Sequence, residues 1–290
     1  MEAVSRNYPR FARAQILVCL TSTTKFAVAH PLIHLGYGHE LSSHTVIIEA
    51  LTLGSCSYNS LHKYLDDPSY TNHPPSPPSS VTPPPSPLDL LQKIHKDTRF
   101  DNLFSTPGPS NVATLFDQRE AEVLEYWNAW SLSKPKQQFQ ASQQAAVALF
   151  VGSRVPNKLF DFFLVHLLTS SHAVRILLPL IPARFQIPLV RQWWLFTIAV
   201  YVAQLRPAIE MHRVRDVDVK GKDWGFVERM ALTAEGAFDA HYVKALRAIR
   251  EAGRTWGDEE GFYLKAAVGF AEGFDRWGGF GIDAAVEGGA

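Results

Sequence analysis

Cysteine is scarce in this sequence, and charge of either sign is not in excess. The two cysteines, Cys19 and Cys56, can form neither a disulfide framework nor a CxxC site, which is compatible with a reducing cytoplasm. Lysine plus arginine equals aspartate plus glutamate at 28 each, so no net charge attracts nucleic acid. We therefore expect a cytoplasmic protein without a nucleic-acid partner.

Long uninterrupted apolar runs are also lacking. The most apolar segments, 159–181 and 190–205, contain polar or charged side chains such as His166, Arg175 and Gln192. A membrane-spanning helix needs roughly 20 nearly uninterrupted apolar residues. These segments instead predict buried helices of a soluble protein with no membrane partner.

The common motifs of nucleophilic and nucleotide chemistry do not occur. The sequence contains no GxSxG elbow, no GxxxxGK[ST] loop and no GxGxxG that follows a strand. It therefore carries no fingerprint of a serine hydrolase, a nucleoside triphosphatase or a dinucleotide-binding domain.

The spacing of the hydrophobic residues along the chain is mainly helical. Hydrophobic residues make up 46% of the chain and recur at helical spacing, with no strand alternation and no internal repeat. We expect an all-α fold, a single irregular helical domain over 30–290 that follows a poorly defined lead-in over 1–29. Eight of the fourteen residues at 74–87 are proline, which suits neither a helix nor a central strand. They predict a proline-rich surface loop at about 68–87.

Two further breaks are predicted between helices. The polar segment 133–142 precedes the apolar run AAVALFVGS, and Pro182 and Pro188 are expected to bound a turn between two buried helices.

Histidine is the most informative residue type. Among eleven histidines, His30 and His34 are four residues apart, so on a helix they share a face and can both reach a divalent metal. His166 lies within the most apolar block, where an unpaired ring nitrogen would cost about 1–3 kcal/mol. It is either a satisfied core histidine or a metal ligand or acid–base group.

A second candidate group lies in the block DAHYVKALRAI. His241 and Lys244 are three residues apart, so their side chains can approach one another on a helix. A lysine beside an imidazole and a bound metal would have its ammonium form disfavoured, and the neutral amine can act as a base or be carbamylated to an anionic oxygen ligand. The alternative is a solvated basic face. Lys265, in FYLKAAV, presents the same two alternatives.

Acidic and aromatic residues near these blocks also have two interpretations. Glu40 and Glu49 either orient the histidines from behind, as carboxylates do around metals, or serve as caps and surface groups. Trp193, Trp194 and the FDFF run at 160–163 either pack in the core or line a pocket for a flat aromatic substrate.

Taken in order, several blocks resemble the questin oxidase-like family of fungal and bacterial oxidoreductases. They are HPLIHLGYGHE followed by IIEALTLG, then DFFLVHLLTSS, DAHYVKALRAI and YLKAA. The resemblance implies a monooxygenase or dioxygenase of secondary metabolism that oxygenates or cleaves an anthraquinone-type aromatic polyketide. It implies either oxygenation with non-haem Fe(II) and O₂ or a Baeyer–Villiger-like oxidation that depends on NADPH, and a small aromatic substrate.

The iron-dependent form of this chemistry implies a ligand set of four histidines and a carboxylated lysine. Carried over to this chain, the resemblance implies metal ligands among five residues: His34, with His30 as its alternative, His166, and Lys244, with Lys265 as its alternative. His241 would be a further ligand or an adjacent group, and it would share the catalytic role with Lys244.

Members of the family are also expected to carry a histidine-rich region before these blocks, to which nothing in 1–29 corresponds. The resemblance therefore leaves a second expectation, that of a shortened, catalytically inactive helical homologue with at most a binding role. It assigns no protein partner.

Overall fold

The computed structural model describes residues 29–56, 60–71, 84–153 and 159–281. These residues form a helical fold with a single two-stranded sheet, so the all-α prediction is confirmed. Apart from Ala29, the predicted lead-in lies outside the described residues, as does the middle of the proline-rich loop. The start of that loop forms the short helix α5 (Pro68–Thr71). In the described part of the chain, no helix combines the length and apolar character needed to cross a membrane.

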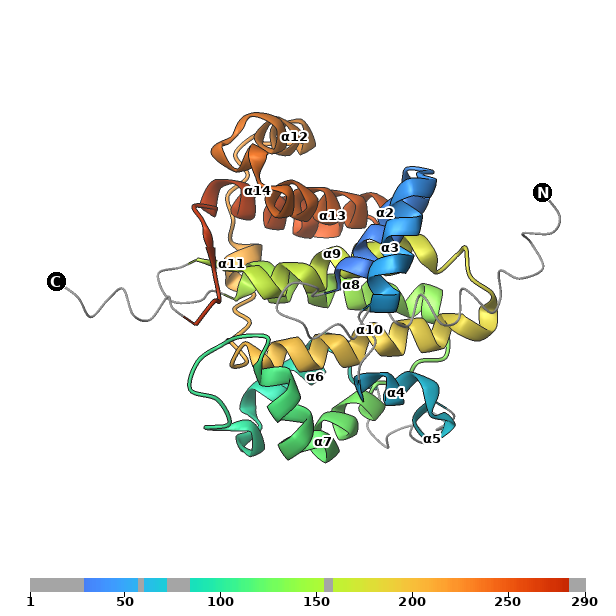
Figure 1. The fold of residues 1–290 in the computed structure, drawn as a ribbon. Coiled ribbons are helices and arrows are strands. Elements are labelled where there is room, and N and C mark those ends of the chain that lie inside the picture. Colours follow the sequence, from blue (N-terminus) through green and yellow to red (C-terminus); the bar gives the residue numbers. More distant parts are fainter. Residues whose placement is uncertain (1–28, 57–59, 72–83, 154–158, 282–290) are drawn as a thin grey trace.

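The helices follow one another along the chain with short connections (Figure 1). The longer ones are α2 (His30–Glu40), α3 (His44–Cys56), α6 (Pro87–Lys96), α7 (Asn111–Ala129), α8 (Pro135–Gly152), α9 (Phe162–Leu177), α10 (Ala183–Ala203), α12 (Trp224–Thr233), α13 (Ala240–Trp256) and α14 (Phe262–Gly273). Short helical turns are η1 (Ser60–His62), α4 (Lys63–Asp66), η2 (Thr98–Phe100), α11 (His212–Arg215), η4 (Glu235–Phe238) and η5 (Glu259–Gly261). Strand β1 (Phe160–Asp161) pairs in parallel with β2 (Trp277–Gly278).

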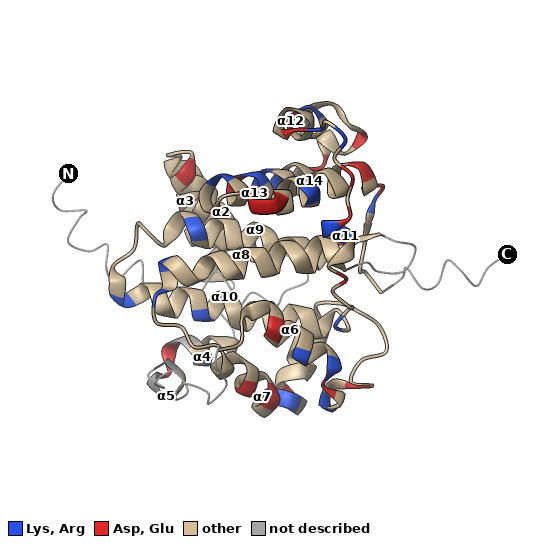
Figure 2. Ribbon diagram, turned by 180° about the vertical axis from the view of Figure 1, so that it is seen from behind, with Lys and Arg blue, Asp and Glu red and all other residues tan. Residues whose placement is uncertain are grey.

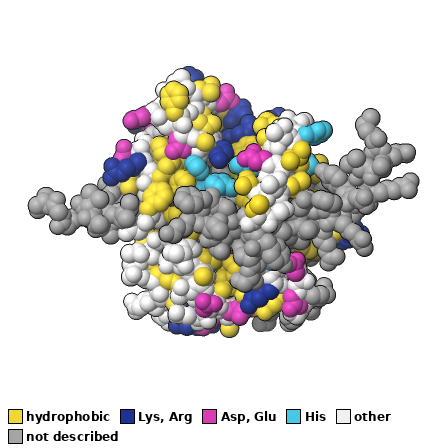
Figure 3. Space-filling model, in the orientation of Figure 1, with side chains coloured by type: hydrophobic (Ala, Val, Ile, Leu, Met, Phe, Trp, Pro, Cys, Tyr) yellow, Lys and Arg dark blue, Asp and Glu magenta, His cyan; other side chains and the backbone are white. Residues whose placement is uncertain are grey.

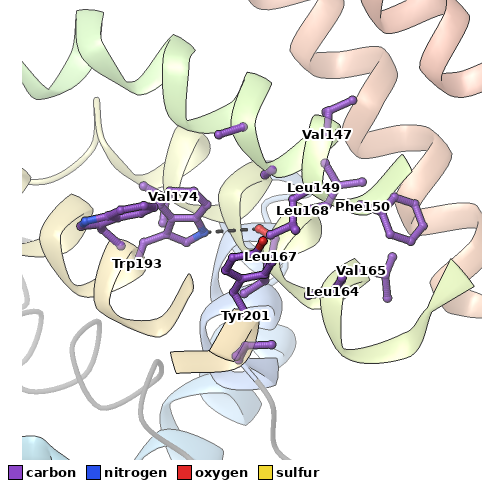
Figure 4. Close-up of a cluster of buried hydrophobic side chains, with 14 of the residues drawn as sticks. Val147, Leu149, Phe150, Leu164, Val165, Leu167, Leu168, Val174, Trp193 and Tyr201 are labelled. Carbon is purple, nitrogen blue, oxygen red and sulfur yellow. Dashed lines mark hydrogen bonds between the residues drawn. The ribbon is translucent and has the colours of Figure 1, made fainter. Parts of the chain in front are cut away.

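The core lies around α8, α9 and α10, which pack against one another. Apolar side chains from these helices meet in Figure 4, where the indole Nε1 of Trp193 donates to the Leu167 carbonyl at 3.3 Å. Trp193 and Trp194 are fully buried, so of their two interpretations core packing is correct. Charged side chains lie mainly on the outer helices α6, α7, α12, α13 and α14 (Figure 2).

The two predicted breaks are shorter than expected: residues 130–134 separate α7 from α8, and residues 178–182, which end at Pro182, separate α9 from α10. Helix α8 begins at Pro135 and takes in most of the polar segment 133–142. Polar residues are compatible with this buried helix because tertiary partners satisfy them, as when Gln143 accepts a hydrogen bond from Trp256 Nε1 at 2.6 Å. Helix α10 contains Pro188 instead of ending there. A proline in the second turn removes one backbone hydrogen bond, a loss that the buried packing of α10 outweighs.

Helix α9 packs against both α2 and α13. Near their first residues, the rings of His30 and His241 lie 6.0 Å apart. Near the last residues of α2, Glu40 forms an ion pair with Arg247 of α13 at 2.9 Å. We call the surface where these three helices meet the seam. Its start is the histidine end, and the region around Glu40 is the ion-pair end.

Between these ends, α2 and α9 approach one another through small residues. A Cβ atom added at Gly36 would lie 2.5 Å from the Cβ of Ala173, so no side chain fits at position 36. This close approach brings the side chains of α2 within reach of those of α9.

Candidate metal centre

Three histidines from three helices meet at the histidine end of the seam. One ring nitrogen each from His30, His166 and His241 lies within 4.8 Å of the others, and we call these residues the triad. The Nε2 atoms of His30 and His166 are 3.1 Å apart, and the ring centroids of His166 and His241 are 5.0 Å apart. Imidazole nitrogens at these separations can converge on one divalent ion. Figure 3 shows histidine side chains near the middle of one face, beside Lys and Arg side chains.

His166 is held in the tautomer that a metal ligand requires. Its Nδ1 lies 2.7 Å from the Phe162 carbonyl, one helical turn earlier, and donates to it. The proton therefore resides on Nδ1, which leaves a lone pair on the Nε2 atom that faces His30. Complete burial is the main cause that holds the pKa of His166 well below its ordinary value, and the neighbouring His30 and His241 lower it further. The ring is neutral, as a metal ligand must be.

His241 is oriented by the residue that begins its helix. Asp239 caps α13, because its Oδ1 accepts from the backbone N–H groups of His241 at 2.7 Å and Tyr242 at 3.1 Å. The same oxygen lies 3.6 Å from Nδ1 of the His241 ring. The other ring nitrogen, Nε2, is buried and has no hydrogen-bond partner among the described residues. A buried polar atom without a partner costs about 1–3 kcal/mol, so this nitrogen suits a ligand that the protein itself does not supply.

Lys244 lies one turn after His241 and faces the same site. Its ammonium lowers the pKa values of His34, His166 and His241. Burial, followed by Lys244, holds the pKa of His241 at about 4, although Asp239 opposes them. Burial also lowers the pKa of Lys244 itself, against the opposing charge of Asp239. It forms no salt bridge with any residue that the structure describes, so its amine remains available to a ligand.

His34 is a neighbour of the triad and not a member. Its ring centroid lies 5.8 Å from that of His30, and its Nδ1 lies 3.4 Å from Glu49 Oε1. Burial lowers the pKa of His34, and Glu49 partly offsets this effect. Of the two histidines proposed from their spacing, the structure brings His30 into contact with His166.

Lys265 is not brought to this site. It lies on α14, which packs against α13, α8, α11 and α12, and no contact joins its side chain to the triad within the described residues. Between the two candidate lysines, only Lys244 adjoins the histidines.

Aromatic rings also border the triad. The Phe162 ring lies 4.6 Å from that of His241 and 4.9 Å from that of His166. Phe162 in turn contacts Phe280 at 5.2 Å and Trp277 at 5.8 Å. From the FDFF run, Phe162 therefore borders the site, and it is joined by aromatic residues that lie more than a hundred positions later.

Two aspartates that cap triad helices were not predicted as caps from the sequence. Asp161 begins α9 by accepting from the N–H groups of Phe163 and Leu164, just as Asp239 begins α13. The available signal was the position of each aspartate directly before an apolar helical block, which is typical of an N-cap. Nothing local in the sequence indicated the contacts of Trp277 and Phe280.

With this geometry in place, comparison with known proteins identifies the family. A family model described as questin oxidase-like matches residues 11–249. The chain belongs to the questin oxidase-like family. The match contains the whole triad and Lys244, whereas Lys265 follows it. Membership in this family suggests an oxidoreductase-like protein. Comparison with curated proteins gave no match.

Proposed function

We propose that this questin oxidase-like protein is an oxidoreductase that uses non-haem Fe(II) and O₂ to oxygenate or cleave an anthraquinone-type aromatic polyketide ring. The observation that carries the proposal is the triad, in which ring nitrogens from three separate helices lie within 4.8 Å of one another. Imidazole ligands with an oxygen donor and an open position suit Fe(II) and the activation of O₂.

The donor set fits a metal because its members are neutral and oriented. His166 and His241 have lowered pKa values, so their rings do not carry a proton that competes with a metal. The Phe162 carbonyl and the Asp239 carboxylate lie behind these rings and direct Nε2 of each toward the site.

Lys244 is the proposed oxygen donor. Burial favours its neutral amine, whose nitrogen can form a bond to the carbon of CO₂ and release a proton, which leaves an anionic carbamate. Without CO₂, the same neutral amine can accept a proton from an acidic hydroxyl group of the substrate. The carbamate in the first role, or the deprotonated substrate oxygen in the second, would supply an anionic oxygen donor close to the triad.

The aromatic border supports a planar aromatic substrate. Phe162 contacts two rings of the triad, and Phe280, which is 43% exposed, extends the same border toward solvent. Stacked or edge-to-face ring contacts contribute about 0.5–1.5 kcal/mol beyond the burial of apolar area. A flat ring held there would lie beside the triad.

Metal binding is the first test of this proposal. The protein, purified under anaerobic conditions, should bind one Fe(II) per chain, and the His166→Gln variant should not. His172→Gln is the matched control, because His172 lies on the same helix and is equally buried yet outside the triad. Failure of the unaltered protein to bind Fe(II) stoichiometrically would overturn the proposed metal centre.

Turnover separates the oxidoreductase from an inactive homologue. The iron-loaded protein should consume O₂ in the presence of a hydroxylated anthraquinone and convert it to an oxygenated or ring-opened product. Iron binding without any such conversion would favour a binding role. Conversion that requires NADPH and continues in the presence of a strong iron chelator would favour an NADPH-dependent oxidation by O₂ without a metal.

A further inference from the structure

Residues 277–281 form a strap that follows α14 and crosses the starts of two triad helices. The strap is part of the red segment after α14 in Figure 1. It begins with strand β2, in which Trp277 and Gly278 pair with Phe160 and Asp161 of β1. It lies beyond residues 11–249, which the family model matches.

The first contact of the strap is with the residue that begins α13. The indole Nε1 of Trp277 donates to Asp239 Oδ2 at 2.7 Å. The other oxygen of this carboxylate caps the helix and faces Nδ1 of His241. One carboxylate thus joins the strap, the start of α13 and a triad ring.

The second contact is with the residue that begins α9. Gln204, whose side chain is 4% exposed, donates from its amide nitrogen to the Gly279 carbonyl at 3.1 Å and to Asp161 Oδ2 at 2.9 Å. Gly279 has a φ of +89°, and a Cβ atom added there would lie 2.4 Å from Asp161 Oδ2. Only glycine lets the strap lie so close to this carboxylate.

The strap therefore links the two aspartates that begin the helices carrying His166 and His241. A carboxylate oriented by a second hydrogen bond holds an imidazole in one tautomer and one direction. If Trp277 did not donate to Asp239 Oδ2, the carboxylate could rotate away from Nδ1 of His241. The Nε2 atom of that ring would then no longer be directed at the other two histidines.

We propose that Trp277 and Gly279 are positioning residues of the triad, through which the strap sets the metal affinity of a site to which it contributes no ligand. This inference rests on the proposed metal centre. It goes beyond the ligands, because it makes the site depend on a segment outside the matched family region.

Cobalt(II) binding to the full chain tests the proposal. Trp277→Phe removes the indole N–H but keeps most of the ring contacts, and it should weaken Co(II) binding by about 10–100-fold. The visible absorption spectrum of any bound Co(II) should also change, because the ligand directions differ. Trp256→Phe is the matched control. It removes another indole donor, the one that bonds Gln143 at 2.6 Å, and it should leave both the affinity and the spectrum unchanged.

A second variant covers the case in which Trp277→Phe does not fold. Asp239→Asn keeps an oxygen that can cap α13, but its amide nitrogen cannot accept from the indole, so Co(II) binding should again weaken. Equal Co(II) affinity in the unaltered protein and these variants would overturn the role of the strap. If Trp256→Phe weakened Co(II) binding equally, the effect of Trp277→Phe would reflect a general loss of stability, and the proposed role of the strap would again be overturned. If the unaltered protein binds no Co(II), the metal centre itself fails.

Discussion

The two ends of the seam are built from the same three helices and both contain a buried histidine of α9, yet the ring nitrogens of these histidines have different hydrogen-bond partners. At the ion-pair end, His172 is as deeply buried as His166 at the histidine end. Both ring nitrogens of His172 have protein partners: Nε2 lies 3.2 Å from Glu40 Oε2, and Nδ1 accepts from Arg175 at 3.3 Å. His172 is therefore a structural histidine.

At the histidine end, Nδ1 of His166 donates to the Phe162 carbonyl, and the partner of its Nε2 is another imidazole. There the Nε2 atoms of two triad rings face each other, and the Nε2 of His241 has no described hydrogen-bond partner. Burial alone therefore does not distinguish a metal ligand from a core histidine. The two ends differ in what meets the ring nitrogens: Glu40 and Arg175 at His172, but a second imidazole at Nε2 of His166 and no described partner at Nε2 of His241.

The largest expected effect comes from exchanging these two histidines for glutamine. His166→Gln should weaken binding of Fe(II) or Co(II) by about 100-fold or more, because loss of a ligand exceeds the roughly 10–100-fold effect of losing an orienting partner. His172→Gln should leave metal affinity unchanged and should lower the stability instead. Isothermal titration under anaerobic conditions measures the first effect, and urea unfolding measures the second. Similar metal affinities in the two variants would contradict the assignment of His166 as a metal ligand and His172 as a structural histidine.

A larger side chain where α2 crosses α9 should affect both ends of the seam. Gly36→Ala places a methyl group against Ala173, so α2 must move away from α9 and carry His30 away from His166. We expect a loss of about 1–3 kcal/mol in the free energy of unfolding and weaker metal binding than in the unaltered protein. Ala173→Gly, which opens space at the same crossing, should leave metal affinity nearly unchanged. Unchanged metal affinity in Gly36→Ala would show that the close approach of α2 to α9 is not needed to bring His30 to His166.

The ion-pair end should dominate the acid sensitivity of the seam. The hydrogen bond from His172 is the main cause that lowers the pKa of Glu40 to about 2 from an ordinary value of 4.5, and Arg247 contributes as well. Since the folded pKa is lower than the unfolded one, this stabilisation is fully present above pH 4.5 and is lost as the pH falls toward 2.

Glu40→Gln removes this acid-sensitive contribution. The substitution should lower the free energy of unfolding by about 1–3 kcal/mol at neutral pH, because it weakens the contacts that residue 40 makes with Arg247 and with His172. The difference in unfolding free energy from the unaltered protein should shrink as the pH is lowered through the same range. A difference that does not change with pH would mean that Glu40 does not titrate as its contacts indicate.

The smallest effect is expected beside the triad. His34 and Glu49 are 30% and 54% exposed, and pairs in contact with solvent contribute about 0–1 kcal/mol. Glu49→Gln should therefore change stability by less than about 1 kcal/mol and should leave metal affinity unchanged in the same titration. A clear loss of metal affinity would place His34 inside the site.

Several features of the site could be predicted because they are local. An imidazole within an apolar block marked His166, and a three-residue spacing placed Lys244 beside His241. The choice between His30 and His34 was not local, because both lie on one face of α2 and only the packing of that helix on α9 selects one. The inclusion of Pro188 in α10 likewise depended on tertiary packing that outweighs a lost hydrogen bond.

The sequence by itself determined the helical class, the family and the blocks that carry the triad. Periodicity, caps and short spacings express these features within a few helical turns, so they can be read along the chain. Only the tertiary structure decided which ring nitrogens meet, which histidine is satisfied by an ion pair, and that residues 277–281 return to the starts of α9 and α13. These outcomes depend on packing between segments far apart in the chain, for which no local pattern exists.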